Sequence, residues 1–365
     1  MESKQAPDYI LFFVVITLMS IGLIMILSAS SIRALADYKD SFYLFKHQLV
    51  WSLVGIGAMF GFMHIDYHLY QKHAMLILLI TIVALVLVLI PGLGRVAGGS
   101  RRWINLGPIG IQPSEMAKLG LVIYLSAYFS KKGEKIKSFT DGLLPPIIVL
   151  GVICLLILME PDLGTAVTIA GTFFIMIFSA GAKALHLFFL TLAGIPMLWF
   201  FIYSEPYRKE RFLAFLNPWS DPLDTGYHII QSLLALGSGG IFGVGLGQSK
   251  QKFLYLPEPG TDFIFAVIGE ELGVLGTLLV LMLFFLFAWR GLKIASSVPD
   301  MFGSMMAVGI TTMVIIQAII NIGVVTSSMP VTGITLPFIS YGGTSLVIML
   351  SAVGVLLNIS RQALE

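Results

Sequence analysis

Ten long apolar segments are the feature that most constrains how this chain can fold. A helix needs about 20 mainly apolar residues to cross the hydrocarbon core of a bilayer. A window of about 19 residues selects 10–29, 46–63, 74–91, 113–130, 143–159, 163–180, 184–203, 263–289, 302–326 and 341–359. Composition agrees, because 57% of the residues are hydrophobic and only 12% are charged. The sequence therefore predicts an all-α, polytopic membrane protein with about ten transmembrane helices, folded as a single integral membrane domain over 1–365.

Charges in the connecting loops predict the orientation of these helices. Lys131, Lys132, Lys135 and Lys137 crowd one short connection, which the positive-inside rule places in the cytoplasm. With ten spans, both termini are then cytoplasmic as well. The first segment is too long, and too closely followed by others, to be a cleaved signal peptide. A net charge of +2 is too small to indicate a nucleic-acid partner.

One long loop, 204–262, separates the seventh and eighth predicted helices and is expected to be extracytoplasmic. A loop of this length is usually functional or disordered, and its many aromatic residues argue against disorder. Within it, 227–236 has the spacing of a short amphipathic or re-entrant helix. Six glycines follow in 237–248, ahead of Lys250 and Lys252. Their backbone N–H groups suit a phosphate, but a plain flexible turn is equally compatible with the pattern.

Ionisable residues at the border of an apolar helix suggest chemistry or transport, because they are costly to keep there. Asp262 stands at such a border, and Glu270 and Glu271 follow it deeper in the eighth segment. Glu115 and Lys118 are three residues apart and share one helix face. They form either a structural ion pair or a site in which Glu115 orients Lys118 toward a phosphate.

Further polar residues gather in the predicted outer loops. Arg101 and Arg102 precede Trp103, a pattern that suits either phosphate recognition or a basic membrane anchor. Glu160 and Asp162 flank a proline and could hold a cation or act as acid and base, although Asp162 is equally a helix N-cap. Several hydroxyl groups lie in 330–345, where Ser340 and Thr344 would bind a sugar or a pyrophosphate or would cap helices.

Together these motifs resemble the SEDS family (shape, elongation, division and sporulation) of bacterial cell-wall proteins. The resemblance rests on Gly99–Trp103, Gln112–Lys118, Glu160–Thr165, Asn217–Trp219 with Asp221–Pro222, Gly245–Lys252, Leu256–Asp262 with Glu270–Gly273, and Pro330–Ser345. It extends over all ten predicted spans. The amino-acid sequence of 245–273 is more similar to the FtsW/SpoVE branch than to RodA.

The resemblance implies a peptidoglycan glycosyltransferase of the bacterial plasma membrane, with its active site on the extracytoplasmic side. Such an enzyme polymerises lipid II into β-1,4 glycan strands with inversion and releases undecaprenyl pyrophosphate. Its partner would be a class B penicillin-binding protein, the cognate transpeptidase. By this similarity Asp262 is the general base, and Arg101, Arg102, Lys118, Lys250 and Lys252 would stabilise the departing pyrophosphate.

Two points stay open in the sequence. A divalent cation, Mg or Mn, would assist the departure of pyrophosphate, but no D-x-D pattern or ligand cluster identifies a site. The alternative function is a lipid II flippase, because ten spans, intramembrane charges and helices interrupted by Gly and Pro also suit a transporter. A non-catalytic scaffold for the transpeptidase would explain the apolar helices but not the placement of the charges.

Overall fold

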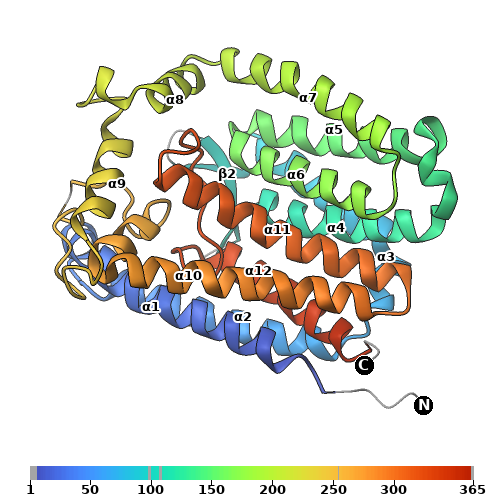
Figure 1. Ribbon diagram of the computed structural model, residues 1–365, viewed down its shortest axis with the longest axis horizontal. Coiled ribbons are helices and arrows are strands. Elements are labelled where there is room, and N and C mark those ends of the chain that lie inside the picture. Colours follow the sequence, from blue (N-terminus) through green and yellow to red (C-terminus); the bar gives the residue numbers. More distant parts are fainter. Residues whose placement is uncertain (1–5, 98–99, 107–108, 254, 363–365) are drawn as a thin grey trace.

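The computed structural model describes residues 6–97, 100–106, 109–253 and 255–362, and most of them are helical (Figure 1). The α-helices are α1 (Tyr9–Tyr38), α2 (Tyr43–His64), α3 (His68–Leu89), α4 (Pro113–Lys132), α5 (Leu144–Met159), α6 (Leu163–Ser179), α7 (Ala184–Tyr203), α8 (Pro206–Leu216), α9 (Tyr227–Ser238), α10 (Ile264–Ser297), α11 (Met301–Val325) and α12 (Gly343–Ser360). Shorter turns are η1 (Gly133–Lys137), η2 (Phe139–Leu143) and η3 (Pro218–Ser220).

Each of the ten predicted apolar segments coincides with a helix, namely α1–α7 and α10–α12. Within the described residues, seven helical stretches are long and apolar enough to cross a membrane: α1, α3, Phe139–Met159, α7, α10, α11 and α12. The apolar helix α6 is shorter, at 17 residues. The chain is therefore a multi-pass helical membrane protein.

Helices α11 and α12 form the centre of the bundle, and 78% of the most apolar window of each is buried. Where α12 crosses α2, Gly354 faces the Met59 carbonyl so closely that a Cβ atom would collide with it. Small residues at such crossings let membrane helices approach each other closely. Close approach favours van der Waals packing, which matters in lipid because no hydrophobic effect drives the helices together there. Gly354 therefore allows the backbones of α2 and α12 to lie in direct contact.

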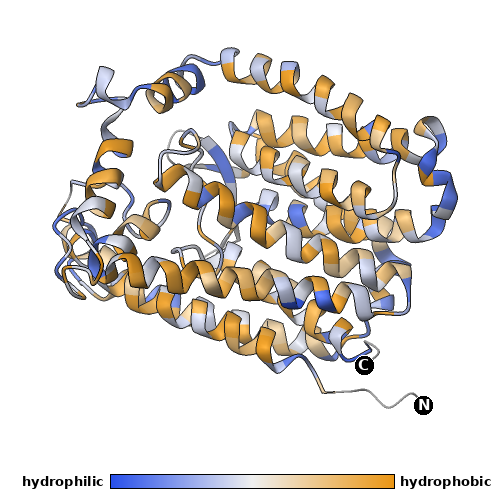
Figure 2. Ribbon diagram, in the orientation of Figure 1, coloured by the Kyte–Doolittle hydropathy of each residue, from blue (hydrophilic) through white to orange (hydrophobic). Residues whose placement is uncertain are grey.

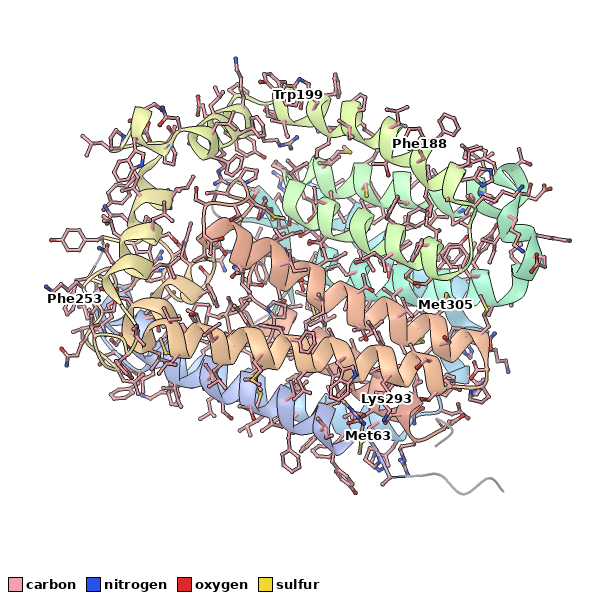
Figure 3. All side chains as sticks on the ribbon, viewed as in Figure 1. Met63, Phe188, Trp199, Phe253, Lys293 and Met305 are labelled. Carbon is pink, nitrogen blue, oxygen red and sulfur yellow. The ribbon has the colours of Figure 1, made fainter. Side chains whose placement is uncertain are left out.

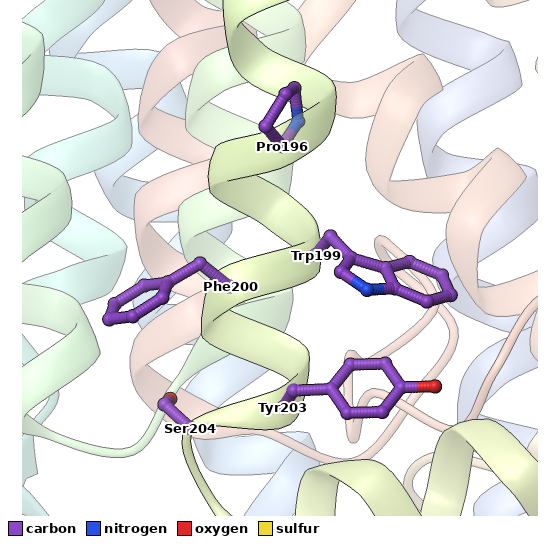
Figure 4. A pocket seen from close by; sticks show the side chains of 5 residues that line it. All are labelled: Pro196, Trp199, Phe200, Tyr203 and Ser204. Atoms are coloured by element: carbon purple, nitrogen blue, oxygen red, sulfur yellow. The ribbon is translucent and has the colours of Figure 1, made fainter.

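Helix α7 is the outermost element, with only 11% of its most apolar window buried. Figure 1 shows it at the edge of the bundle, and Figure 3 shows Phe188 and Trp199 pointing away from the other helices. A cavity of about 430 Å³ lies against it, lined by Pro196, Trp199, Phe200, Tyr203 and Ser204 (Figure 4). An apolar helix with this exposure is expected to face lipid.

The two ends of the bundle differ in what they carry. Both described chain ends and the lysine-rich α4–α5 connection lie at one end, which we call the terminal end (Figure 1). The long loop after α7 lies at the other, which we call the loop end. Figure 3 places Phe253 there, far from Lys293. Hydrophilic segments gather at the ends and the helices between them are largely apolar, as Figure 2 shows.

The structure corrects the all-helical prediction in the connection between α3 and α4. Strands β1 (Gly94–Ala97), β2 (Ser100–Leu106) and β3 (Ile109–Ile111) form a small antiparallel sheet in the order β1-β2-β3. The helix boundaries also move: α1 continues to Tyr38, nine residues beyond the predicted segment, and α10 is kinked at Gly273. Gly273 has a φ of 66°, and a Cβ there would collide with the backbone of Gly243.

Candidate functional site

Asp262 lies in the last loop residues before α10, and hydrogen bonds from two other segments fix its backbone. The Asn321 side chain on α11 donates to the Asp262 carbonyl at 2.8 Å and to the Ile334 carbonyl at 2.7 Å. The Ser340 hydroxyl donates to the Thr261 carbonyl at 2.6 Å. These bonds join the loop before α10 to the loop before α12. Asp262 is therefore held by a rigid helix and not by a free loop.

The Asp262 carboxyl group has an environment that favours proton uptake. Burial raises its pKa to about 6, and the negative charges of Glu258 and Asp162 act in the same direction. The cations Arg211 and Arg102 oppose this shift and lower the pKa. Within the described residues no side chain or backbone group hydrogen-bonds the carboxylate. At neutral pH the group is mainly ionised yet basic enough to accept a proton, as a general base must be.

Arg102 on β2 binds the turn between α5 and α6. Its Nε donates to the Glu160 carbonyl at 3.0 Å, its Nη2 donates to the Pro161 carbonyl, and its Nη1 lies 3.7 Å from an Asp162 carboxylate oxygen. Asp162 in turn accepts from the Thr165 amide at 3.0 Å and the Thr165 hydroxyl at 2.9 Å. Asp162 therefore caps α6 and also contributes to the charge around Asp262.

Glu160 is fully buried, and neither of its carboxyl oxygens has a hydrogen-bond partner within the described residues. Burial raises its pKa to about 8, with a further rise from the charge of Asp162 and an opposing effect of Arg102. At neutral pH this carboxyl group is mainly protonated. It can then donate a hydrogen bond, whereas it would be a weak ligand for a cation. We call Asp262, Glu160, Asp162 and Arg102 the Asp262 cluster.

Glu115 and Lys118 form a buried ion pair inside the bundle. The Lys118 ammonium donates to Glu115 Oε1 at 2.7 Å and to Gln317 Oε1 at 2.6 Å. The second Glu115 oxygen accepts from the Ser345 hydroxyl at 2.8 Å, and Gln317 donates to the Thr335 carbonyl at 3.0 Å. This geometry is that of the structural ion pair, joining α4, α11 and the segment before α12. Phosphate binding by Lys118 stays a prediction.

The glycine-rich segment after α9 binds carboxylates of its own chain. Glu271 accepts from the backbone amides of Gly247 at 3.0 Å and Ser249 at 3.3 Å. Glu270 accepts from the Lys250 amide at 2.8 Å and from the Ser249 hydroxyl. The N–H groups predicted to close around phosphate thus bind two buried glutamates, which fixes the loop against α10. A phosphate at these amides would have to displace a glutamate.

The two lysines of this loop have different environments. Lys252 is buried, and its ammonium lies 2.9 Å from Glu271 Oε1 and 3.0 Å from the Ser28 hydroxyl on α1. The Lys250 side chain is exposed to solvent. Only Lys250 is therefore free to meet a ligand without breaking a buried ion pair.

The remaining predicted residues have structural contacts. Arg101 donates to the Leu89 carbonyl at 3.3 Å and its Nε is buried without a partner in the described chain. Thr344 donates to the Gly110 carbonyl at 2.7 Å, and the Ser340 hydroxyl also accepts from a backbone amide. Gly99, which begins one of the motifs, lies outside the described residues.

Three contributors were missed in the sequence. Asn321 and Gln317 are four residues apart on α11 and so share one face, which is a readable signal in an apolar helix. Arg211 acts on the charge of Asp262 from α8, a helix within the long loop 204–262, and no sequence pattern distinguishes it there. Of the predicted residues, the structure gathers Arg102, Glu160, Asp162 and Asp262, and it places Glu115, Lys118 and Lys252 in separate networks.

Metal binding has no cluster to support it in the described part of the chain. No three or more His, Cys, Asp or Glu side chains there are grouped so that they could hold an ion. The fold and the site thus define a multi-pass helical membrane protein with a carboxyl group of raised pKa in the loop before α10.

A profile of the FtsW/RodA/SpoVE family of cell cycle proteins matches residues 8–365, and the chain belongs to this family. It is 51% identical over 358 residues to stage V sporulation protein E of Bacillus subtilis, covering 98% of both chains. It is 43% identical over 362 residues to a probable peptidoglycan glycosyltransferase FtsW of Geobacter metallireducens, covering 99% of this chain and 96% of that one. The predicted family is therefore confirmed, and these relatives come from the FtsW/SpoVE branch.

Solved structures with the same fold agree. A chain of a peptidoglycan synthase complex, described as coordinating polymerization and crosslinking, matches with a TM-score of 0.81 and 30% identity over 98% of both chains. The rod shape determining protein RodA of Thermus thermophilus matches with a TM-score of 0.73 and 27% identity, covering 99% of this chain and 98% of that one.

Proposed function

We propose that this chain is a peptidoglycan glycosyltransferase that polymerises lipid II into β-1,4 glycan strands. The observation that carries the proposal is the Asp262 carboxyl group, which has a raised pKa and lies near the charges of Arg102 and Arg211, on a backbone that α11 and Ser340 hold in place. A relative 43% identical over nearly the whole chain bears the name of this activity.

In the proposed reaction, the 4-hydroxyl of an acceptor sugar attacks the anomeric carbon of the donor glycan. The new C–O bond forms as the bond from that carbon to the pyrophosphate oxygen breaks, so configuration inverts in one displacement. Asp262 takes the hydroxyl proton, and undecaprenyl pyrophosphate leaves with the bonding electrons. Arg102 and Arg211 would stabilise the negative charge that develops on the leaving group.

Protonated Glu160 would add a hydrogen-bond donor to the Asp262 cluster. Three further predicted residues would position the loops around Asp262 through the hydrogen bonds described above: Asp162, Ser340 and Thr344. Exposed Lys250 remains a candidate contact to the pyrophosphate. The ammonium groups of Lys118 and Lys252 are less suited to this role, because buried carboxylates already bind them.

We infer that all ten long helices cross the plasma membrane, with both termini in the cytoplasm and the loop 204–262 outside. The lysine-rich α4–α5 connection supports this orientation, because it lies at the terminal end together with both described chain ends (Figure 1). The Asp262 cluster then faces the extracytoplasmic side, where a crosslinking partner would receive the strands. We propose a class B penicillin-binding protein as that partner, supported by the matched synthase complex.

The test uses the purified chain with a class B penicillin-binding protein and lipid II, and resolves the glycan products on a gel. Wild type should make glycan strands, and Asp262→Asn should reduce the rate by about 10²–10⁴-fold or more, the usual contribution of a general base. Asp224→Asn, an exposed carboxylate in the same loop, is the matched control. Parallel reactions with a chelator, Mg or Mn measure a metal requirement. Normal polymerisation by Asp262→Asn would refute the catalytic assignment, and lipid II translocation in liposomes that survives this substitution would favour the flippase.

A further inference from the structure

A second cavity, of about 200 Å³, lies beside the segment that precedes Asp262. Its walls come from the end of α1, the start of α2, the residues 258–261 and the loop before α12. The polar and aromatic side chains that line it include Arg33, Asp37, Tyr38, Glu258 and Tyr341. Because Thr261 also lines it, a molecule in this cavity lies next to the residue that carries the carboxylate.

The charged side chains that line this cavity sum to a net negative charge. Arg33 Nη1 lies 2.8 Å from a Glu258 carboxylate oxygen, and Arg33 Nε lies 3.5 Å from an oxygen of Asp37. One cation thus faces two carboxylates, which disfavours an anionic ligand such as pyrophosphate. Planar groups that donate and accept hydrogen bonds instead suit the neighbouring hydroxyls of a neutral sugar.

Aromatic rings continue from the cavity along α2. Tyr38 stacks on Tyr43 with ring centroids 4.1 Å apart and an angle of 13° between the rings. The Tyr341 hydroxyl lies 3.0 Å from His47 Nδ1, and the His47 ring stacks on Tyr43. Such rings offer apolar faces with a polar edge, which match the apolar faces and polar rim of a pyranose ring.

We propose that this cavity is the subsite for a sugar ring of the acceptor saccharide. The assignment rests on the proposed function and adds to it a division of the site into two sides. The donor pyrophosphate needs cations, and the cations that act on Asp262 are Arg102 and Arg211. The Arg33 cavity, in which carboxylates outnumber the cation, takes the acceptor, whose hydroxyl must come within hydrogen-bond reach of the base. Its volume, below the roughly 300–1,000 Å³ of pockets for drug-sized ligands, suits about one ring.

Ser30 allows the cavity to be filled without removing any contact between helices. It lines the cavity, is 4% exposed, and among the described residues its hydroxyl bonds only the Ile26 carbonyl of its own helix. Ser30→Leu therefore places a larger side chain where the ring would lie. The neighbour Ser31 does not line the cavity and also bonds within its own helix, so Ser31→Leu is the matched control.

Two measurements test the subsite: the KM and kcat for lipid II in the presence of the transpeptidase, and binding of a GlcNAc–MurNAc disaccharide followed by saturation-transfer NMR. The disaccharide carries no pyrophosphate, so it reports saccharide binding alone. Ser30→Leu should raise the KM about tenfold or more and weaken disaccharide binding by a similar factor, whereas Ser31→Leu should change neither. Tyr38→Ala, at a half-exposed ring, should weaken disaccharide binding about tenfold and covers the case in which Ser30→Leu fails to fold.

The outcomes separate this inference from the proposed function. Wild-type polymerisation together with an unchanged KM and unchanged disaccharide binding in Ser30→Leu and Tyr38→Ala would overturn the subsite alone. Absence of disaccharide binding to wild type at about 10 mM would also overturn it. If wild type made no glycan but bound the disaccharide in a manner sensitive to Ser30→Leu, the cavity would stand as a saccharide site, and its role as an acceptor subsite would fall with the polymerase proposal.

Discussion

The rate of polymerisation at acidic pH should report the environment of Asp262. A base acts only when ionised, so the rate should rise with pH through the pKa of about 6 and then level off. At pH 5 such a group is ionised in only about one tenth of the molecules, whereas a carboxyl group with the ordinary pKa would be more than about nine tenths ionised. We therefore expect kcat/KM at pH 5 to be about tenfold below its value at pH 7.

Two substitutions should move this pH profile in opposite directions. Glu258→Gln removes a negative charge that raises the pKa of Asp262, so the profile should shift to lower pH. Arg211→Gln removes a cation that lowers the pKa, so the profile should shift to higher pH. Initial rates with lipid II from about pH 4.5 to 8 measure both, and Glu134→Gln at the exposed α4–α5 connection is the control. A rate that stays constant down to about pH 4.5, or shifts of the same sign in both variants, would refute the reasoning.

Two further predictions concern buried charges. The folded pKa of Glu160, about 8, is raised above the ordinary 4.5, so its contribution to stability is complete below pH 4.5 and is lost as the pH rises through 8. Glu160→Gln stays neutral and should become more stable relative to wild type between pH 5 and 8, by an amount of order 3 kcal/mol; identical thermal melts across that range would contradict this. Lys118→Met alone should destabilise the fold by about 3–5 kcal/mol, and adding Glu115→Leu should restore most of it. A double variant that folds but makes no glycan would show that the pair contacts substrate.

The helices could be predicted from the sequence because the bilayer leaves few alternatives. A backbone in lipid must satisfy its own N–H and C=O groups, so a long apolar run becomes a helix of about the same length. The prediction was wrong where the chain leaves the lipid. Residues 30–38, which include Arg33 and Asp37, continue α1 beyond the apolar run, and β1–β3 fold from a loop whose short strands have no readable alternation. Hydropathy marks where lipid ends but not where a helix ends.

The site was predictable in its residue types but not in its pairings. The spacing of Glu115 and Lys118 identified a pair, yet Gln317 reaches that pair from a helix some two hundred residues away in the chain. The glycine-rich segment and the glutamates Glu270 and Glu271 were both visible. That they bind each other depends on the kink at Gly273, which brings α10 back against the loop. Long-range contacts of this kind leave no local pattern.

The distribution of buried charge supports Asp262 as the proposed general base. Removing an ion from water is costly unless a partner compensates it, and breaking such a pair costs about 3–5 kcal/mol. The buried ion pairs Lys118–Glu115 and Lys252–Glu271, and the partly buried pair Arg290–Asp8, are closed by a direct contact. Within the same residues, Asp262 has opposite charges near it but no group bonded to its oxygens. The fold therefore holds this carboxylate rigidly through its backbone while leaving its oxygens able to accept a proton, and a direct ion pair there would lower its pKa and weaken it as a base.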